Sequence, residues 1–160
     1  MRKIIIAAMT GNRVIGKDNK MPWHVSEELK HFKKATLGFP LIMGRKTLEA
    51  MDALLKKRKN IVVTRNQNYI PPFNEALVFH NLQDAYNYCE DEGYEKLFVI
   101  GGGEIYLQAL NSVDEIILSV MKFEREGDVF FPEIDKNKFE LTSKEEHSEF
   151  TIMWFKKKSK

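Results

Sequence analysis

The chain has 160 residues, of which 43% are hydrophobic, so it is long enough for one domain with a substantial core and too short for two ordinary domains. Its 25 Lys and Arg residues against 23 Asp and Glu residues give a formal charge of +2, which provides little attraction for nucleic acid or an anionic membrane. Cys89 is the single cysteine, so a disulfide framework and a thiolate metal site are excluded. We expect one cytoplasmic domain over residues 1–160, with no bound metal.

Short β-branched runs alternate with amphipathic stretches through the first two thirds of the chain. The first run, KIIIAAM at residues 3–9, is shorter than the apolar part of a secretion signal and leads to no convincing cleavage site, so we interpret it as a strand. Further strands are predicted at residues 40–44 (PLIMG), 59–64 (KNIVVT), 76–80 (ALVFH) and 96–101 (KLFVIG). Helical patterns lie near residues 26–36, 46–55, 82–92 and 104–110. This alternation predicts βαβ units and a largely parallel sheet with helices on both faces.

The pattern changes after residue 113, where three extended runs follow without helices between them. They are VDEIILSVM (113–121), KFELTSKEEH (138–147) and TIMWFKKK (151–158). Such runs predict a closing antiparallel section, and the fold class is α/β. No apolar run approaches the length of a membrane span, and no apolar helix face is left unexplained, so we expect a soluble monomer.

A segment of about fifteen residues, TGNRVIGKDNKMPWH (residues 10–24), separates the first strand from the first helix. Loops of this length without structure of their own are usually functional or disordered. Its apolar residues Val14, Ile15, Met21 and Trp23 argue against disorder. We therefore predict a mobile flap over a site, and we call residues 10–24 the flap.

Three of the predicted strands end in residues that suit phosphate. Residues 101–103 are three glycines before a helix, where backbone N–H groups and the helix N-terminus favour an anion. Residues 44–47 (GRKT) place two cations at a helix start, which opposes the helix dipole unless an anion lies between them. Thr64 and Arg65 end the third strand. A tight turn or a surface arginine explains each one alone, but three on one sheet predict a dinucleotide, and arginines suit the 2′-phosphate of NADP.

The stretch PWHVSEELKHF (residues 22–32) contains two adjacent carboxylates at a predicted helix start, with Ser26 as its N-cap. Successive helical residues turn by about 100°, which puts Glu28 roughly 40° from the centre of the apolar stripe and Glu27 roughly 140° away. Glu27 therefore faces water and Glu28 faces the interior. A buried carboxylate needs a partner, which is either a lysine of this lysine-rich chain or a ligand.

Five segments resemble dihydrofolate reductase in order and spacing, and together they span essentially the whole chain. They are VIGKDNKMPWHVSEELKHFKKAT, IMGRKT, RKNIVVTRN, VIGGGEIY and EGDVFFPEI. The resemblance implies a mostly parallel eight-stranded central sheet with an antiparallel carboxy-terminal edge strand, flanked by four helices. It also implies reduction of 7,8-dihydrofolate to 5,6,7,8-tetrahydrofolate, with NADPH as the cofactor and antifolates as inhibitors.

The resemblance also implies roles for individual residues. Glu28 would bind N3 and the 2-amino group of the pterin and favour protonation at N5 through a water that Trp23 holds, and Ser119 would hydrogen-bond to Glu28. Arg58 would bind the α-carboxylate of the glutamate tail. The remaining substrate residues would be Ile6, Ala8, Leu29, Phe32, Met51, Leu55 and Ile100. By default, however, apolar residues such as these belong to the core, and an arginine in the KKRK run is solvated.

For the cofactor, the implied residues are Ala8, Ile15, Gly16, Gly44, Arg45, Lys46, Thr47, Thr64, Arg65, Gly101, Gly102, Gly103, Glu104, Ile105 and Tyr106. A cis peptide bond is expected between Gly101 and Gly102. Asp128 resembles the acid of a loop that docks on the flap, so flap closure is expected to gate turnover.

Three departures from the family pattern matter. The conformation of residues 52–57 is open, because AMDALLKKR replaces a segment with glycine and proline. Glu104 stands where some members have an arginine for the 2′-phosphate. Glu28 in place of Asp suggests insensitivity to trimethoprim. Two rival functions are left open: a related NADPH-dependent reductase of riboflavin synthesis, and a non-catalytic nucleotide-binding module that associates with RNA.

Overall fold

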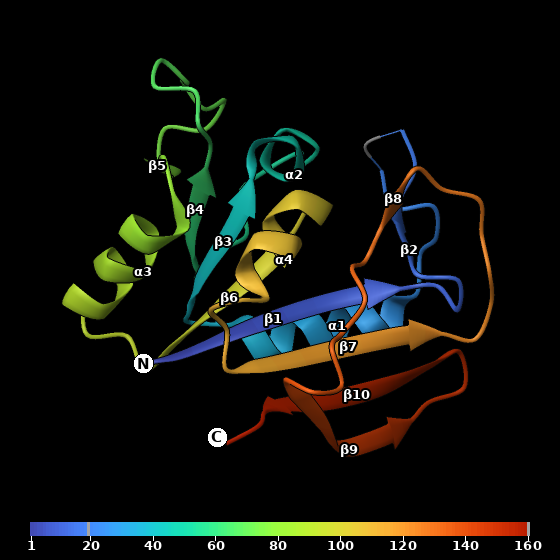
Figure 1. Cartoon of the computed structure of the whole chain (residues 1–160). Coiled ribbons are helices and arrows are strands. Elements are labelled where there is room, and N and C mark those ends of the chain that lie inside the picture. Colours follow the sequence, from blue (N-terminus) through green and yellow to red (C-terminus); the bar gives the residue numbers. More distant parts are fainter. Residues whose placement is uncertain (19, 160) are drawn as a thin grey trace.

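One twisted sheet organises the computed structural model, which describes residues 1–18 and 20–159 (Figure 1). Its eight strands lie in the order β5-β4-β3-β6-β1-β7-β10-β9. Their bounds are β1 Arg2–Met9, β3 Pro40–Gly44, β4 Lys59–Val63, β5 Leu77–Phe79, β6 Lys96–Gly101, β7 Glu115–Met121, β9 Phe139–Glu146 and β10 Phe150–Lys157. The strands from β5 to β7 are parallel, and β10 runs antiparallel to both β7 and β9. The predicted α/β class with a mostly parallel sheet is confirmed.

Strand β1 shows why the sheet is covered on both faces. Residues 4–8 are all buried, and successive side chains of a strand point to opposite faces. Ile5 and Ala7 pack into a cluster with residues of the helices α3 (Leu82–Asp91) and α4 (Gly103–Ala109). Ile4 and Ile6 pack into a second cluster that includes Phe32. The run IIIAA is therefore continuous because each face has its own helical layer.

Four helices flank the sheet, as predicted. The other two are α1 (Ser26–Thr36), which lies behind β1 in Figure 1, and α2 (Arg45–Glu49). Helix α3 begins at the N-cap Asn81, whose side chain accepts a hydrogen bond of 2.8 Å from the Asp84 amide. Within residues 1–18 and 20–159, no helix has the length and apolar character that crossing a membrane requires.

Helix α2 is shorter than predicted, because it ends at Glu49 instead of continuing to residue 55. The buried side chain of Asn60 accepts from the Leu55 amide at 3.3 Å and donates to the Leu55 carbonyl at 2.9 Å. It also contacts the Arg58 carbonyl at 3.1 Å. Asn60 thus satisfies backbone groups of Leu55 that a helix would satisfy internally, and residues 52–57 form an irregular, non-helical segment that ends in a turn.

The predicted flap contains a short strand that the sequence analysis did not predict. Residues Val14–Gly16 form the strand β2, which pairs antiparallel with β8 (Val129–Phe130) in a second, two-stranded sheet. Neither strand was predicted, because each is only two or three residues long and depends on a partner more than 100 residues away.

The N-terminus of α1 also differs from the prediction. Val25, not Ser26, is the N-cap residue, and no side chain caps the first turn. The Ser26 hydroxyl instead lies 3.3 Å from Nε2 of His24. The first turn of α1 therefore lacks the local stabilisation that a side-chain cap provides.

Candidate functional site

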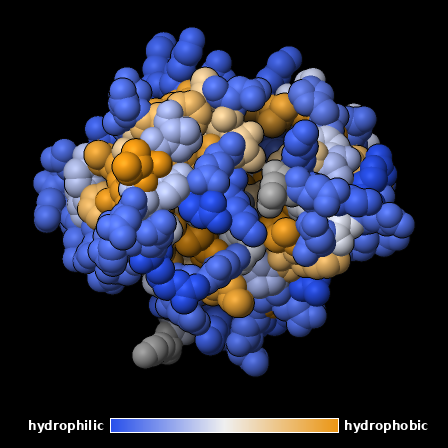
Figure 2. Space-filling view, turned by 90° about the horizontal axis from the view of Figure 1, so that it is seen from above, coloured by the Kyte–Doolittle hydropathy of each residue, from blue (hydrophilic) through white to orange (hydrophobic). Residues whose placement is uncertain are grey.

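The carboxyl ends of β3, β4 and β6 meet at one edge of the sheet, as the sequence predicted. They border a pocket of about 650 Å³. Figure 2, which views this end of the molecule, shows hydrophilic side chains over most of the face, with separate hydrophobic patches between them. The pocket is lined by Gly44, Arg45, Lys46, Thr47, Val63, Thr64, Arg65, Asn66, His80, Asn81, Gly102, Gly103, Glu104, Ile105, Gln108 and Val129. All three predicted phosphate-binding strand ends thus contribute to one pocket.

The glycine turn at the end of β6 lets the chain pass close to neighbouring groups. The Gly101–Gly102 peptide is cis, as expected, and Gly101 has a φ of +129°, which disfavours any side chain. A Cβ at Gly101 would lie 3.3 Å from the Tyr106 hydroxyl. That buried hydroxyl donates toward the carbonyls of Ile100 at 2.6 Å and Ile6 at 3.1 Å, and its burial raises the pKa of Tyr106. Tyr106 therefore lies beneath the turn and ties β6 to β1.

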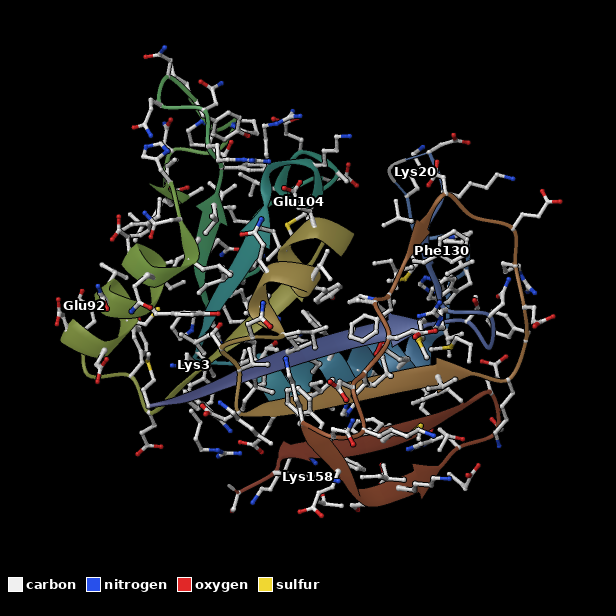
Figure 3. The ribbon with its side chains drawn as sticks, viewed as in Figure 1. Lys3, Lys20, Glu92, Glu104, Phe130 and Lys158 are labelled. Atoms are coloured by element: carbon white, nitrogen blue, oxygen red, sulfur yellow. The ribbon has the colours of Figure 1, made fainter. Side chains whose placement is uncertain are left out.

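Two arginines of the pocket are each paired with a carboxylate. The Arg65 guanidinium donates to Glu104 Oε1 at 2.8 Å and so links the segment after β4 to the first turn of α4, where Glu104 is labelled in Figure 3. The Arg45 guanidinium donates to Glu49 Oε1 at 2.8 Å within α2. Both Arg65 and Glu104 are mostly exposed, so this pair is screened by solvent and can exchange for another anion.

Glu49 has a second hydrogen-bond partner besides Arg45, which is Tyr69. The Tyr69 hydroxyl donates to Glu49 Oε2 at 2.8 Å. Burial, and then this hydrogen bond, raises the pKa of Tyr69 to about 12. Tyr69 therefore remains a hydrogen-bond donor at neutral pH and helps to hold Glu49 in place beside Arg45.

Several residues of the pocket were missed in the sequence. They are Val63, Asn66, His80, Asn81, Gln108 and Val129. Nδ1 of His80 lies 2.8 Å from the Thr64 carbonyl, which requires an N–H at Nδ1. His80 follows the end of β5, so the rule applied to the other strand ends would have found it. Val129 had no such signal, because only the pairing of β8 with the flap brings it here.

The other residues assigned to the cofactor do not line this pocket. Ile15 on β2 is 4.0 Å from the position of a Cβ at Gly103, so the flap borders the glycine turn. Gly16 packs against Val129. Ala8 and Gly101 are buried in β1 and β6, and Tyr106 lies beneath the turn.

Glu28 faces the interior and Glu27 faces solvent, as helical periodicity predicted. Glu28 is 7% exposed, whereas the side chain of Glu27 is 55% exposed. Burial alone raises the pKa of Glu28 to about 7, with no contribution from a hydrogen bond or a neighbouring charge. The alternative that a lysine pairs with Glu28 is therefore wrong for the described residues, among which this buried carboxyl has no charged or hydrogen-bonding partner.

Most of the predicted substrate walls belong to one apolar cluster. It contains Ile6, Phe32, Met51, Leu55 and Ile100, contributed by β1, α1, the turns after α2 and β6. Ala8 and Trp23 belong to the neighbouring cluster, in which Trp23 packs edge-on against Phe123. Leu29 is 42% exposed and stands at the rim.

Ser119 lies next to Ala8 in the register between β7 and β1, and it is buried. No hydrogen bond contributes to the pKa of Glu28, so the Ser119 hydroxyl does not bind that carboxyl in this structure. The bond between these two described residues stays a prediction for the enzyme with substrate.

Arg58 is half-buried and anchored, in contrast to a solvated member of a basic run. Its Nε donates to the Lys56 carbonyl at 2.9 Å, and its Nη1 donates to Thr36 Oγ1 at 3.1 Å. Thr36 in turn donates to the Phe32 carbonyl at 2.8 Å. Burial lowers the pKa of Arg58, and the end of α1 holds its guanidinium in one orientation.

The loop that precedes β8 docks on the flap, as expected. The Asp18 amide donates to Asp128 Oδ2 at 3.0 Å, and the Asp128 amide donates to the Gly16 carbonyl at 3.0 Å. Lys17 adds an ion pair of 3.3 Å with Glu126. The flap is therefore held from both its backbone and its side chains.

Comparisons with known proteins agree on one family. The family model described as dihydrofolate reductase matches residues 3–156. The dihydrofolate reductase of Bacillus subtilis (strain 168) is 42% identical over 141 residues, which cover 88% of this chain and 82% of that protein. That of Mycoplasma genitalium is 35% identical and covers 97% of this chain and 98% of that protein. A solved dihydrofolate reductase from Enterococcus faecalis, complexed with NADP(H) and RAB-propyl, superposes with a TM-score of 0.87 at 29% identity, covering 99% of this chain and 97% of that chain.

Proposed function

The chain belongs to the dihydrofolate reductase family and is an NADPH-dependent oxidoreductase, and on this premise we propose the roles of its residues. The reaction is the reduction of 7,8-dihydrofolate to 5,6,7,8-tetrahydrofolate, which supplies one-carbon and thymidylate metabolism. Family membership favours this reaction over the reductase of riboflavin synthesis and over a non-catalytic module. The observation that carries the proposal is the buried and unpaired carboxyl of Glu28.

Glu28 is proposed to orient the pterin ring. N3–H and the 2-amino group of the pterin are both donors, so they match the two oxygens of one carboxylate and favour its ionised form. The negative charge then favours protonation of N5, with the proton delivered through a water next to Trp23. The apolar surroundings support this role, because they strengthen the interaction of the carboxylate with the pterin.

The remaining substrate residues are proposed to position the rest of the molecule. Phe32 lies one helical turn after Glu28, so a flat ring can stack on it while binding the carboxylate. Ile6, Ala8, Leu29, Met51, Leu55 and Ile100 complete the walls, and the Ser119 hydroxyl supports Glu28. The Arg58 guanidinium, held by Thr36, is suited to a bidentate contact with the α-carboxylate of the glutamate tail.

The pocket at the strand ends fits NADPH. It has three cations, two threonine hydroxyls and a glycine turn whose backbone approaches the pocket closely. A Cβ at Gly103 would lie 2.9 Å from the side chain of Val129, so only glycine at this position allows the turn to approach β8 this closely. NADPH supplies the hydride when it is bound. Thr47, Thr64, Lys46, Arg45 and Arg65 are proposed to hold its phosphates.

We further propose that the enzyme is a monomer formed by one domain over residues 1–160, and that it works in the cytoplasm. The buried free thiol of Cys89 is consistent with a reducing compartment. Analytical ultracentrifugation measures the oligomeric state directly, and a dimer at micromolar concentration contradicts this part of the proposal.

Oxidation of NADPH at 340 nm tests the proposed role of Glu28. The wild-type enzyme is expected to show oxidation that depends on dihydrofolate, and Glu28→Gln is expected to lose most of it at neutral pH. Glu90→Gln is the matched control, because Glu90 is an exposed carboxylate on α3, which packs on the opposite face of the sheet from Phe32 of α1. Full activity of Glu28→Gln would show that another group orients and protonates the substrate.

A further inference from the structure

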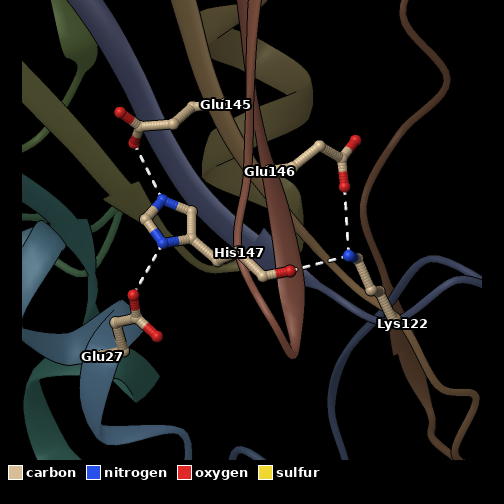
Figure 4. Close-up of polar contacts among 5 residues, drawn as sticks. All are labelled: Glu27, Lys122, Glu145, Glu146 and His147. Carbon is tan, nitrogen blue, oxygen red and sulfur yellow. Dashed lines mark hydrogen bonds and ion pairs between the residues drawn. The ribbon is translucent and has the colours of Figure 1, made fainter.

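His147, in the turn between β9 and β10, joins two carboxylates that come from different parts of the fold. Its Nδ1 lies 2.7 Å from Oε1 of Glu27 on α1, and its Nε2 lies 2.8 Å from Oε2 of Glu145 on β9 (Figure 4). Ionised carboxylates only accept hydrogen bonds, and a neutral imidazole has a single N–H. Both contacts are therefore satisfied together only by the imidazolium form of His147.

The surroundings hold the imidazole in this position. Its ring stacks on Phe150 with centroids 4.5 Å apart and planes 3° apart. The Lys122 ammonium donates to the His147 carbonyl at 2.7 Å and pairs with Glu146 at 3.0 Å, so it fixes the backbone of the turn from the other side (Figure 4). The side chain of His147 is only 21% exposed. Its position is thus set by several contacts.

The charges around His147 favour its protonated form. The hydrogen bonds to Glu145 and then to Glu27 raise the pKa of His147. His31, one helical turn after Glu27, also faces this group. Burial lowers its pKa, the charge of Glu145 acts in the opposite direction, and the charge of His147 lowers it further. The Lys122 ammonium donates to the backbone carbonyl of His147 and forms an ion pair with Glu146, so it does not contact the imidazole ring.

Helix α1 needs such a contact at its N-terminus. No side chain caps its first turn, and that turn carries both Glu27 and Glu28. If the first turn frayed, the Glu28 carboxyl could rotate toward water. Hydration there would relieve the energetic cost of burying this carboxyl without a partner. A contact on Glu27 restrains the next residue through the backbone.

We propose that His147 is a positioning residue of the reductase, which clamps Glu27 to the β9–β10 turn and so fixes the depth of Glu28 in the substrate pocket. We call the three residues Glu27, Glu145 and His147 the clamp. The proposal rests on the proposed role of Glu28. The clamp is complete below the raised pKa of His147 and opens as pH rises through that pKa, because a neutral imidazole keeps only one of the two contacts.

The test compares kcat/KM for dihydrofolate between His147→Gln and the wild-type enzyme at pH 6 and at pH 9. The ratio of the two values removes the pH dependence that the two enzymes share. Loss of a partly exposed charged contact is expected to lower kcat/KM by about 2- to 5-fold at pH 6. At pH 9 the ratio is expected to approach one. An equal loss at both pH values, or no loss at pH 6, overturns the proposal.

Two further variants make the test specific. Glu140→Gln is the matched control, since Glu140 is an exposed carboxylate on β9 that is not part of the clamp, and its ratio is expected to stay near one. Glu27→Gln, which removes one charge and keeps the size of the side chain, replaces His147→Gln if that variant fails to fold. The double variant of Glu27 and His147 is expected to lose no more than His147→Gln alone, and additive losses overturn the clamp.

All of these enzymes retain Glu28. A ratio of kcat/KM values that is the same at pH 6 and pH 9 therefore overturns the clamp without affecting the proposed role of Glu28. Glu28→Gln tests that role separately. If Glu28→Gln is fully active, the proposed function of Glu28 fails whatever the ratio shows.

Discussion

Replacing Glu28 by glutamine is expected to stabilise the unliganded enzyme at high pH while it abolishes activity. The carboxyl has a pKa of about 7 in the folded protein against an ordinary value of 4.5, because it is buried without a partner. The folded state therefore binds this proton more tightly than the unfolded state, and stability falls as pH rises from about 4.5 to about 7. Each tenfold change in proton affinity corresponds to about 1.4 kcal/mol, so ionising Glu28 costs the folded state about 3 kcal/mol at pH 8.

Urea denaturation of the wild-type and Glu28→Gln proteins at pH 5 and pH 8 measures this cost. The difference in unfolding free energy between the two proteins is expected to shift by about 2–3 kcal/mol in favour of Glu28→Gln between these pH values. The cost of burying the glutamine amide is the same at both pH values and cancels. A difference that does not change with pH would refute the reasoning, because it would mean that Glu28 ionises normally or has a partner.

The other predictions concern the nucleotide pocket, the thiol of Cys89 and the response to trimethoprim. Arg65→Ala is expected to weaken NADPH binding by about 5- to 70-fold and NADH binding far less, whereas Glu104→Gln is expected to tighten NADPH binding by up to about 5-fold. If a fluorescence titration showed that Arg65→Ala weakens both nucleotides equally, Arg65 would not bind the 2′-phosphate. Gly103→Ala places a Cβ 2.9 Å from a β8 methyl group and is expected to lower stability by about 1–3 kcal/mol, and an unchanged urea midpoint would contradict this. Burial raises the pKa of Cys89 to about 12, so native enzyme is expected to leave a disulfide reagent unreacted at pH 8, while urea-unfolded enzyme reacts. Trimethoprim is expected to inhibit weakly because Glu28 is longer than aspartate, and potent inhibition of the purified enzyme would rule this out.

Helical and strand periodicity predicted the parts of the site that depend on one element. The inward direction of Glu28 follows from the spacing of the apolar residues on α1, and it needs no information from the rest of the chain. The strand ends could be brought together in advance because parallel strands of one sheet place their carboxyl ends at the same edge. Their meeting in a single pocket follows from the alternation of strands and helices alone.

The parts that escaped prediction depend on distant partners. Residues 50–55 have a helical pattern, yet the side chain of Asn60 takes up the backbone groups of Leu55, and α2 ends early. Strand β2 pairs with β8 across more than 100 residues, and two short strands carry too little periodicity to be recognised. His147 was predicted only as the last residue of the extended run at 138–147, because nothing in its local sequence indicates that it contacts Glu27 on α1.

Carbon-13 NMR titration of the Glu28 carboxyl, with and without dihydrofolate, tests the central claim most directly. In the free enzyme one glutamate carboxyl is expected to titrate near pH 7, and its signal should be missing from Glu28→Gln. When dihydrofolate is bound in the absence of NADPH, the two pterin donors favour the ionised form, so the pKa of Glu28 is expected to fall well below 7. A carboxyl that titrates near its ordinary value in the free enzyme, or that does not respond to dihydrofolate, would contradict the assignment of Glu28 as the acid that binds the substrate.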